Sequence, residues 1–125
     1  MRKVCIITST RADFGPLRPL IDEIHHRDDL DLQLVATGTH FAPSFGKSVL
    51  EINDYGYPII KKIEMCMDSD SSIGVAKSMG LLMMSVAEAF AELQPDIIIL
   101  LGDRTELISI AGVAIVSRIP IAHIS

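Results

Sequence analysis

The hydrophobic positions along the chain follow two alternating periods. Runs of apolar, often β-branched residues predict strands at 3–9, 32–37, 59–65, 96–101 and 120–124. The strand at 59–65 is more amphipathic than the others, which favours a position nearer an edge of the sheet. Between the strands, apolar residues recur at helical spacing and predict helices at about 16–27, after Ser44, at about 72–93, and at about 105–117. Strands that alternate with helices imply right-handed crossovers and a parallel sheet covered on both faces.

We therefore expect an α/β fold, a Rossmann-like parallel sheet of about five strands in the order 3-2-1-4-5. That order places a topological switch between the first and fourth strands, and ligands bind such sheets at the carboxyl ends of the strands. Two local predictions accompany it. Pro16 suits the first turn of a helix, and Gly80, which costs a helix about 1 kcal/mol relative to Ala, predicts close packing against a neighbour.

Composition narrows the class of protein. The 125 residues suit a single domain, and a mean hydropathy of +0.38 suits a sheet buried on both faces. No apolar run approaches the roughly 18 residues needed to span a bilayer, so we expect no membrane segment. The net charge of −5 disfavours a nucleic-acid partner.

The cysteines and the N-terminal residues indicate the cellular compartment of the protein. The apolar stretch after Met1 is too short for a signal peptide, which predicts a cytoplasmic protein. Cys5 is expected in the core and Cys66 near a loop; a disulfide between them stays open, although a cytoplasmic location disfavours it. Metal-ligand spacings such as CxxC are absent, so we expect no metal.

Charged side chains that could bind a ligand or take part in catalysis follow the predicted strands. The loop after the first strand holds Arg11 and Asp13 and leads into a helix N-terminus, whose free N–H groups suit a phosphate. Arg11 could add a bidentate phosphate contact. The alternative is a polar loop with an Arg–Asp surface pair.

The fourth strand is followed at once by Asp103, Arg104 and then Glu106. A carboxylate there can be partly desolvated and act as a general acid or base, and it can also cap the next helix. His40, after the second strand, is either a site residue or a solvated one. His123, in the last strand, is either a core histidine bonded to backbone or a residue that points to the site.

These segments together resemble the hydrolysing UDP-N-acetylglucosamine 2-epimerases of bacterial sialic acid synthesis. The resemblance rests on Thr10-Arg11-Ala12-Asp13-Phe14-Gly15, on Gly38-Thr39-His40, on Leu101-Gly102-Asp103-Arg104-Thr105-Glu106 and on Ile119-Pro120-Ile121-Ala122-His123-Ile124. It implies the N-terminal domain of a GT-B type fold at residues 1–125, apparently truncated, with the C-terminal domain missing. Such a chain is expected to be inactive by itself.

The resemblance also implies the chemistry. The C2 proton is removed, UDP is eliminated to leave a 2-acetamidoglucal, and water adds to give N-acetylmannosamine; no cofactor takes part. Asp103 is then the acid/base residue, and Arg11, Gly15, Arg104 and His40 bind the UDP-sugar. Asp13, Glu106 and His123 are further site candidates, and the full-length protein is expected to be a homo-oligomer.

Three other functions remain open. Related bacterial enzymes hydrolyse UDP-2,4-diacetamido-trideoxyhexoses, and a non-hydrolysing relative interconverts the two UDP-sugars. The third is a non-catalytic α/β nucleotide-binding module.

Overall fold

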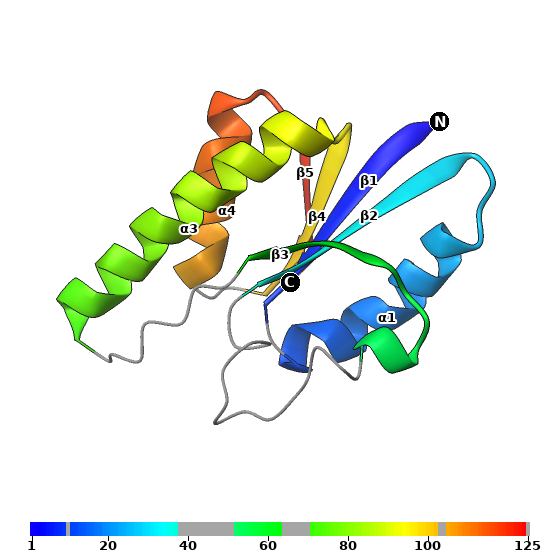
Figure 1. The fold of residues 1–125 in the computed structure, drawn as a ribbon, viewed down its shortest axis with the longest axis horizontal. Helices are drawn as coiled ribbons and strands as arrows, with labels where there is room; N and C mark the ends of the chain where they lie inside the picture. The colour runs from blue at the N-terminus through cyan, green and yellow to red at the C-terminus, as the bar shows by residue number, and fades with distance from the viewer. Residues whose placement is uncertain (10, 38–51, 64–70, 103–104, 125) are drawn as a thin grey trace.

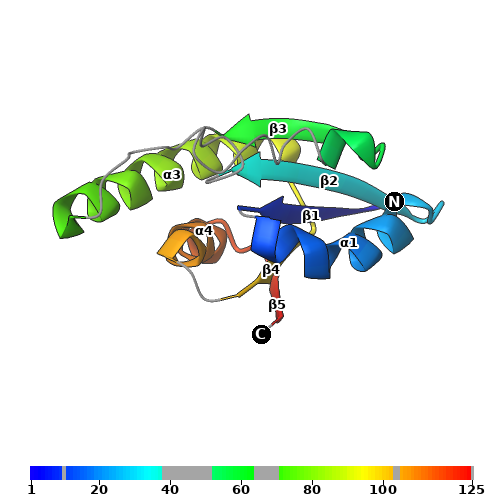
Figure 2. The same cartoon turned by 90° about the horizontal axis from the view of Figure 1, so that it is seen from below.

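The fold is a five-stranded parallel sheet between two helical layers (Figures 1 and 2). A computed structural model describes residues 1–9, 11–37, 52–63, 71–102 and 105–124. Its elements are β1 (Arg2–Thr8), α1 (Arg11–His25), β2 (Leu30–Thr37), β3 (Ile59–Ile63), α3 (Ser72–Leu93), β4 (Ile97–Leu101), α4 (Thr105–Val116) and β5 (Ile121–Ile124). The strand order β3-β2-β1-β4-β5 confirms the predicted order.

The central strand β1 is paired on both sides. Cys5 lies opposite Gln33 of β2 and opposite Ile98 of β4, and both ladders are parallel. Because successive strand residues point to opposite faces, β1 supplies two cores at once. Cys5 and Ile7 face α3 and α4, whereas Val4 and Ile6 face α1.

Each helix buries one apolar stripe against the sheet. Phe14, Leu17, Ile21 and Ile24 of α1 recur at helical spacing and are all buried. Ile52, in a short helical turn at 52–54, is buried in the same cluster. The rest of the predicted second helix, including Ser44, lies outside the described residues.

The third predicted helix has the expected ends. The Ser71 hydroxyl caps α3 by accepting from the Gly74 N–H at 3.0 Å. The left-handed Gln94 ends it by donating its N–H to the Phe90 carbonyl. By length and composition alone, α3 among the described residues is long and apolar enough to cross a membrane. Core helices pass the same test, and α3 packs one side onto the sheet through Leu82, Val86 and Phe90.

Two local predictions are wrong. Helix α1 begins at Arg11, so Pro16 and Pro19 lie inside it and not in its first turn. Packing of the apolar stripe outweighs the hydrogen bonds that the prolines cannot donate. Gly80 is exposed, and no described atom lies within 4 Å of an added Cβ, because it points outward from α3. The close approach occurs at Gly112 of α4, where an added Cβ would lie 3.0 Å from Met83 Cε.

Adjacent leucines of α3 test the burial directly. Leu82 is fully buried, whereas Leu81 is 49% exposed. We expect Leu82→Ala to lower the free energy of unfolding by about 3 kcal/mol, because it removes packed methyl groups and leaves a cavity. Leu81→Ala should cost less than about 1 kcal/mol. Denaturant titration of the two variants measures both, and equal losses would contradict the packing described here.

Candidate functional site

The carboxyl ends of β1 and β4 lie side by side where the connections diverge. Ile6 of β1 pairs with Ile99 of β4, and each strand ends two residues later. From there α1 packs on one face of the sheet and α4 on the other. This is the predicted topological switch, the position at which open α/β sheets bind ligands. The arrows of β1, β2 and β3 all point toward this same side of the sheet in Figure 2.

Asp13 holds the connection from β1 to α1. Its carboxylate is buried and accepts the backbone N–H of Ser9 at 3.0 Å and the hydroxyl of Thr8. Asp13 is therefore not a surface residue, whereas its pairing with Arg11 stays untested because the Arg11 side chain lies outside the described part of the structure. Because Asp13 lies in the first turn of α1, these bonds tie the helix N-terminus to the end of the strand.

Arg11 and Gly15 belong to the same connection. Arg11 is the first residue of α1, and its side chain lies outside the described part. Gly15 is exposed on α1, and no atom of the described residues outside its own helix turn lies within 4 Å of a Cβ built at this position. A ligand at this helix N-terminus would meet free N–H groups and the positive end of the helix dipole.

The last residues of β5 hold the turn that follows β4. Gly102 has φ +98°, a conformation that favours glycine. Its N–H donates to the Ile124 carbonyl at 3.0 Å, and its own carbonyl lies 2.5 Å from His123 Nε2. A carbonyl can only accept, so Nε2 carries the proton. Both peptide groups of this turn are thus bonded to β5.

His123 combines parts of the two sequence interpretations. It does bond to backbone, but its side chain is exposed at the carboxyl edge of the sheet, so a core position is wrong. Gly102, whose carbonyl accepts the hydrogen bond from His123, directly precedes Asp103 in the chain. Asp103, Arg104 and His40 lie outside the described residues, so their predicted roles stay predictions.

Glu106 is buried in the first turn of α4, one turn after the predicted acid/base position. A carboxylate is favourably placed near a helix N-terminus. Among the predicted site residues, the structure therefore brings backbone or side chains of Asp13, Glu106 and His123 to one edge of the sheet.

Other polar groups at this edge were not anticipated from the sequence. Thr8 and Ser9 act as donors to Asp13, a role that no motif signals. The Thr37 hydroxyl, at the end of β2, is buried without a hydrogen-bond partner among the described residues. The position of Thr37 at the end of a buried strand, directly before Gly38-Thr39-His40, is the sequence signal that could have pointed to it.

Cys5 has the predicted core position. It is a free, fully buried thiol, and burial raises its pKa to about 12. It is therefore protonated at neutral pH and suited to packing, not to nucleophilic chemistry. Cys66 lies outside the described residues.

A hollow of about 380 Å³ lies between the C-terminal ends of α3 and α4, lined by Phe90, Gln94, Pro95 and Arg118 among others. It contains none of the predicted site residues. Since α3 and α4 begin at the carboxyl edge of the sheet and end at the other, the hollow does not belong to the candidate site.

Comparison with known proteins tests the resemblance. The family model described as UDP-N-acetylglucosamine 2-epimerase matches residues 22–125. The chain belongs to this family. It is 42% identical over 123 residues to the GDP/UDP-N,N'-diacetylbacillosamine 2-epimerase (hydrolyzing) of Campylobacter jejuni, covering 98% of the chain and 32% of that protein. It is 33% identical over 124 residues to the UDP-N,N'-diacetylbacillosamine 2-epimerase (hydrolyzing) of Legionella pneumophila, covering 99% of the chain and 33% of that protein.

Solved structures of the family share the fold. A crystal structure of UDP-N-acetylglucosamine 2-epimerase superposes with a TM-score of 0.82 at 20% identity, covering 98% of the chain and 32% of that protein. The Neisseria meningitidis enzyme bound to UDP-GlcNAc gives 0.80 at 17% identity, covering 97% and 31%. The expected Rossmann-like fold of GT-B type is confirmed. The chain spans about a third of the length of these family members.

Asp13→Asn tests the anchoring at β1. The amide keeps the shape but weakens the bonds to Ser9 and Thr8, since hydrogen bonds to a charged acceptor are roughly twice as strong. We expect a loss of about 1–2 kcal/mol in the free energy of unfolding. Asp31→Asn, at an exposed position of β2, is the control. An equal and small effect of both substitutions would reject the anchoring role.

Proposed function

We propose that the chain is the N-terminal, UDP-sugar-binding domain of a hydrolysing 2-epimerase. Its membership in the UDP-N-acetylglucosamine 2-epimerase family supports this most strongly. The substrate we favour is a UDP-2,4-diacetamido-trideoxyhexose, because the Campylobacter and Legionella relatives are named for N,N'-diacetylbacillosamine. UDP-N-acetylglucosamine is the second candidate, supported by the Neisseria meningitidis relative at 30% identity.

The proposed reaction has two steps. A base removes the proton from C2, the C1–O bond breaks with its electron pair leaving on UDP, and a C1=C2 double bond forms. Water then adds its oxygen at C1, and a proton returns to C2 from the opposite face. The products are free UDP and a sugar with inverted C2.

Negative charge grows on the departing diphosphate in the first step. We assign its stabilisation to the N-terminus of α1 together with Arg11, because oriented N–H groups and a guanidinium favour such charge. Arg104, His40 and Gly15 are proposed as further contacts of the UDP-sugar. Asp103 is proposed as the acid/base group. The chemistry calls on no cofactor or metal.

The bonds at Gly102 give His123 a proposed positioning role. Hydrogen bonds from Gly102 to His123 and Ile124 fix the position of Gly102, from which the chain continues to Asp103. Asp13 plays the matching part for Arg11 at the other connection. A cytoplasmic location without nucleic-acid or membrane partners stays a prediction from the sequence.

The full-length gene product, incubated with each UDP-sugar, tests the proposal. We expect release of UDP together with the free C2-inverted sugar, faster from the diacetamido substrate. Formation of a UDP-linked epimer would indicate the non-hydrolysing reaction instead. Absence of both turnover and UDP binding would leave a non-catalytic module.

Asp103→Asn in that protein tests the acid/base assignment. We expect kcat to fall by at least about 100-fold, the usual contribution of a positioned acid or base, while UDP binding persists. Measurement of UDP release and of UDP affinity by calorimetry separates the two effects. Near-normal UDP release would reject the role of Asp103.

His123→Phe tests positioning. It removes the donor to the Gly102 carbonyl, and we expect kcat to fall by about 10-fold, which corresponds to roughly 1.4 kcal/mol, with KM little changed. His123→Gln keeps an N–H donor and should recover part of that loss. Identical kcat values for the two variants would show that the hydrogen bond does not matter.

A further inference from the structure

Two prolines interrupt the hydrogen bonds of α1 just after its first turn. Pro16 and Pro19 both lie inside the helix. Because proline has no N–H, the carbonyls of Ala12 and Gly15 receive no α-helical hydrogen bond from four residues ahead. The first turn, Arg11–Gly15, is therefore bonded to the following turn less completely than in an ordinary helix.

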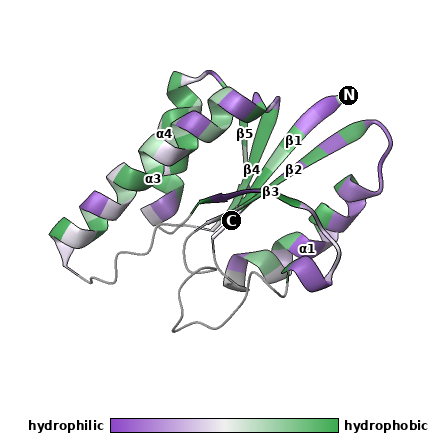
Figure 3. Cartoon of the chain, in the orientation of Figure 1, coloured by the Kyte–Doolittle hydropathy of each residue, from purple (hydrophilic) through white to green (hydrophobic). Residues whose placement is uncertain are grey.

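The interrupted side of α1 faces solvent. Gly15, Pro16 and Pro19 are exposed, whereas Phe14 and Leu17 are buried against the sheet. Figure 3 shows the same division, since the outer side of α1 is mostly hydrophilic. Helices bend most readily at proline, and no atom of the described residues outside the helix turn lies within 4 Å of a Cβ built at Gly15. The first turn can therefore depart from the helix axis on this side without meeting a described atom.

Contacts with β1 hold the first turn. The Asp13 carboxylate accepts the Ser9 N–H at 3.0 Å, and Phe14 is buried in the same cluster as Ile6 of β1. These contacts come from the strand that ends at the candidate site. They relate the direction of the turn to the edge of the sheet at which a ligand would bind.

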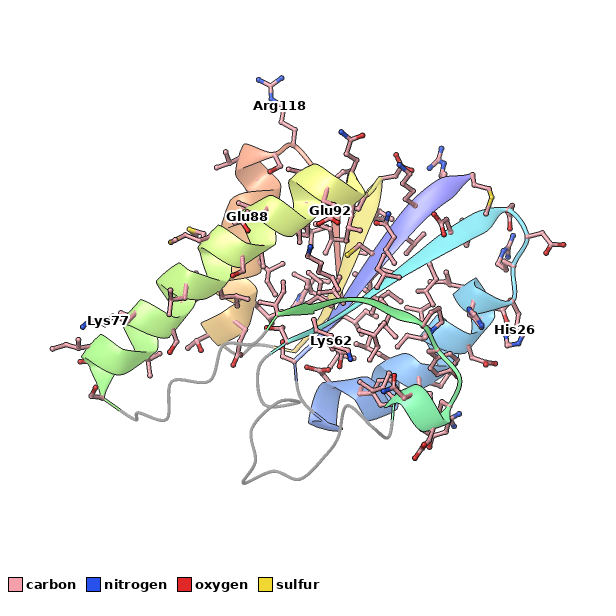
Figure 4. The ribbon with its side chains drawn as sticks, viewed as in Figure 1. His26, Lys62, Lys77, Glu88, Glu92 and Arg118 are labelled. Atoms are coloured by element: carbon pink, nitrogen blue, oxygen red, sulfur yellow. The ribbon has the colours of Figure 1, made fainter. Side chains whose placement is uncertain are left out.

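Different contacts hold the rest of α1. Asp22 accepts the Tyr57 hydroxyl at 3.1 Å, and Ile21 is fully buried. His26, labelled in Figure 4 just beyond the far end of the helix, has its Nδ1 2.8 Å from the Asp22 carbonyl. In an uninterrupted helix these contacts would also direct the first turn, because the backbone hydrogen bonds carry the axis from each turn to the next.

We propose that Pro16 and Pro19 are positioning residues for the diphosphate of the UDP-sugar. They release the first turn of α1 from the direction of the helix, and the turn takes the direction that Asp13 sets from β1. This inference rests on the proposed function, in which the N–H groups at the start of α1 bind the diphosphate. The prolines act through the turn and not by contact with the ligand.

A small change of direction is enough to matter. Arg11, the start of α1, lies five residues before Pro16, which is about 7.5 Å along the axis. A bend of about 20° at that point moves the helix start by roughly 2.5 Å. Hydrogen bonds to phosphate oxygens require donor–acceptor distances of about 2.7–3.2 Å, so such a shift decides whether the N–H groups reach them.

Replacement of both prolines by alanine tests the inference in the full-length gene product. The double variant Pro16→Ala/Pro19→Ala restores two N–H donors and aligns the first turn with the helix axis. We expect Tm to rise, because alanine is the better helix former, and the affinity for UDP to fall at least about 5-fold. Differential scanning calorimetry measures the first effect, and isothermal titration calorimetry measures the second. Prolines that served only the fold would give the reverse, a lower Tm with unchanged UDP affinity.

Gly80→Ala in α3 is the matched control. It improves a helix at an exposed position on the other face of the sheet, so it should raise Tm without changing the affinity for UDP. Asp13→Asn tests the route by which the prolines act. It should weaken UDP binding in the wild-type protein but have little further effect in the double proline variant, where Asp13 no longer directs the turn.

The other outcomes overturn the inference. Unchanged UDP affinity in the double proline variant would show that the direction of the turn does not matter. An equal loss in Gly80→Ala would assign the effect to general stabilisation, and additive losses with Asp13→Asn would show that Asp13 and the prolines act separately. A wild-type protein that binds no UDP would refute the proposed function, and this inference with it.

Discussion

The pairing of β1 with both β2 and β4 is the constraint on which the rest of the structure depends. A strand hydrogen-bonded on both sides cannot have an exposed edge, and covered faces leave it almost no contact with water. From Val4 to Thr8 every residue of β1 is buried. Its alternating side chains join two separate cores, one beneath α1 and one beneath α3 and α4. Loss of this strand would separate the two helical layers.

The same constraint positions the chemistry. Since β1 and β4 are neighbours whose connections depart to opposite faces, their carboxyl ends are left accessible at one edge. Backbone groups at that edge are held by short polar contacts: Asp13 binds the start of one connection, and β5 binds the turn of the other. A rigid scaffold of this kind is the usual support for binding loops in proteins.

Much of this was predictable from local pattern. The strand and helix periods depend on residues close in sequence, and the strand order follows from the general topology of alternating strands and helices, so both could be derived before the structure. The N-terminus of α1 and the environment of Gly80 could not. Pro16 inside a helix is tolerated only because the stripe beginning at Phe14 packs on the sheet. The sequence predicted that Gly80 packs closely against a neighbour. Gly80 is exposed because of the way α3 is oriented on the sheet, and local sequence does not show that orientation.

By itself, the sequence determined the fold class and the family, because hydrophobic period and motif order are properties of the chain alone. Tertiary structure decided which polar residues are buried and to what they bond. The bond from His123 to Gly102 joins residues 21 positions apart, and that from Ser109 to Met79 joins residues 30 apart. Such contacts depend on how the elements are packed together, and local sequence does not encode that packing in a form that can be read directly.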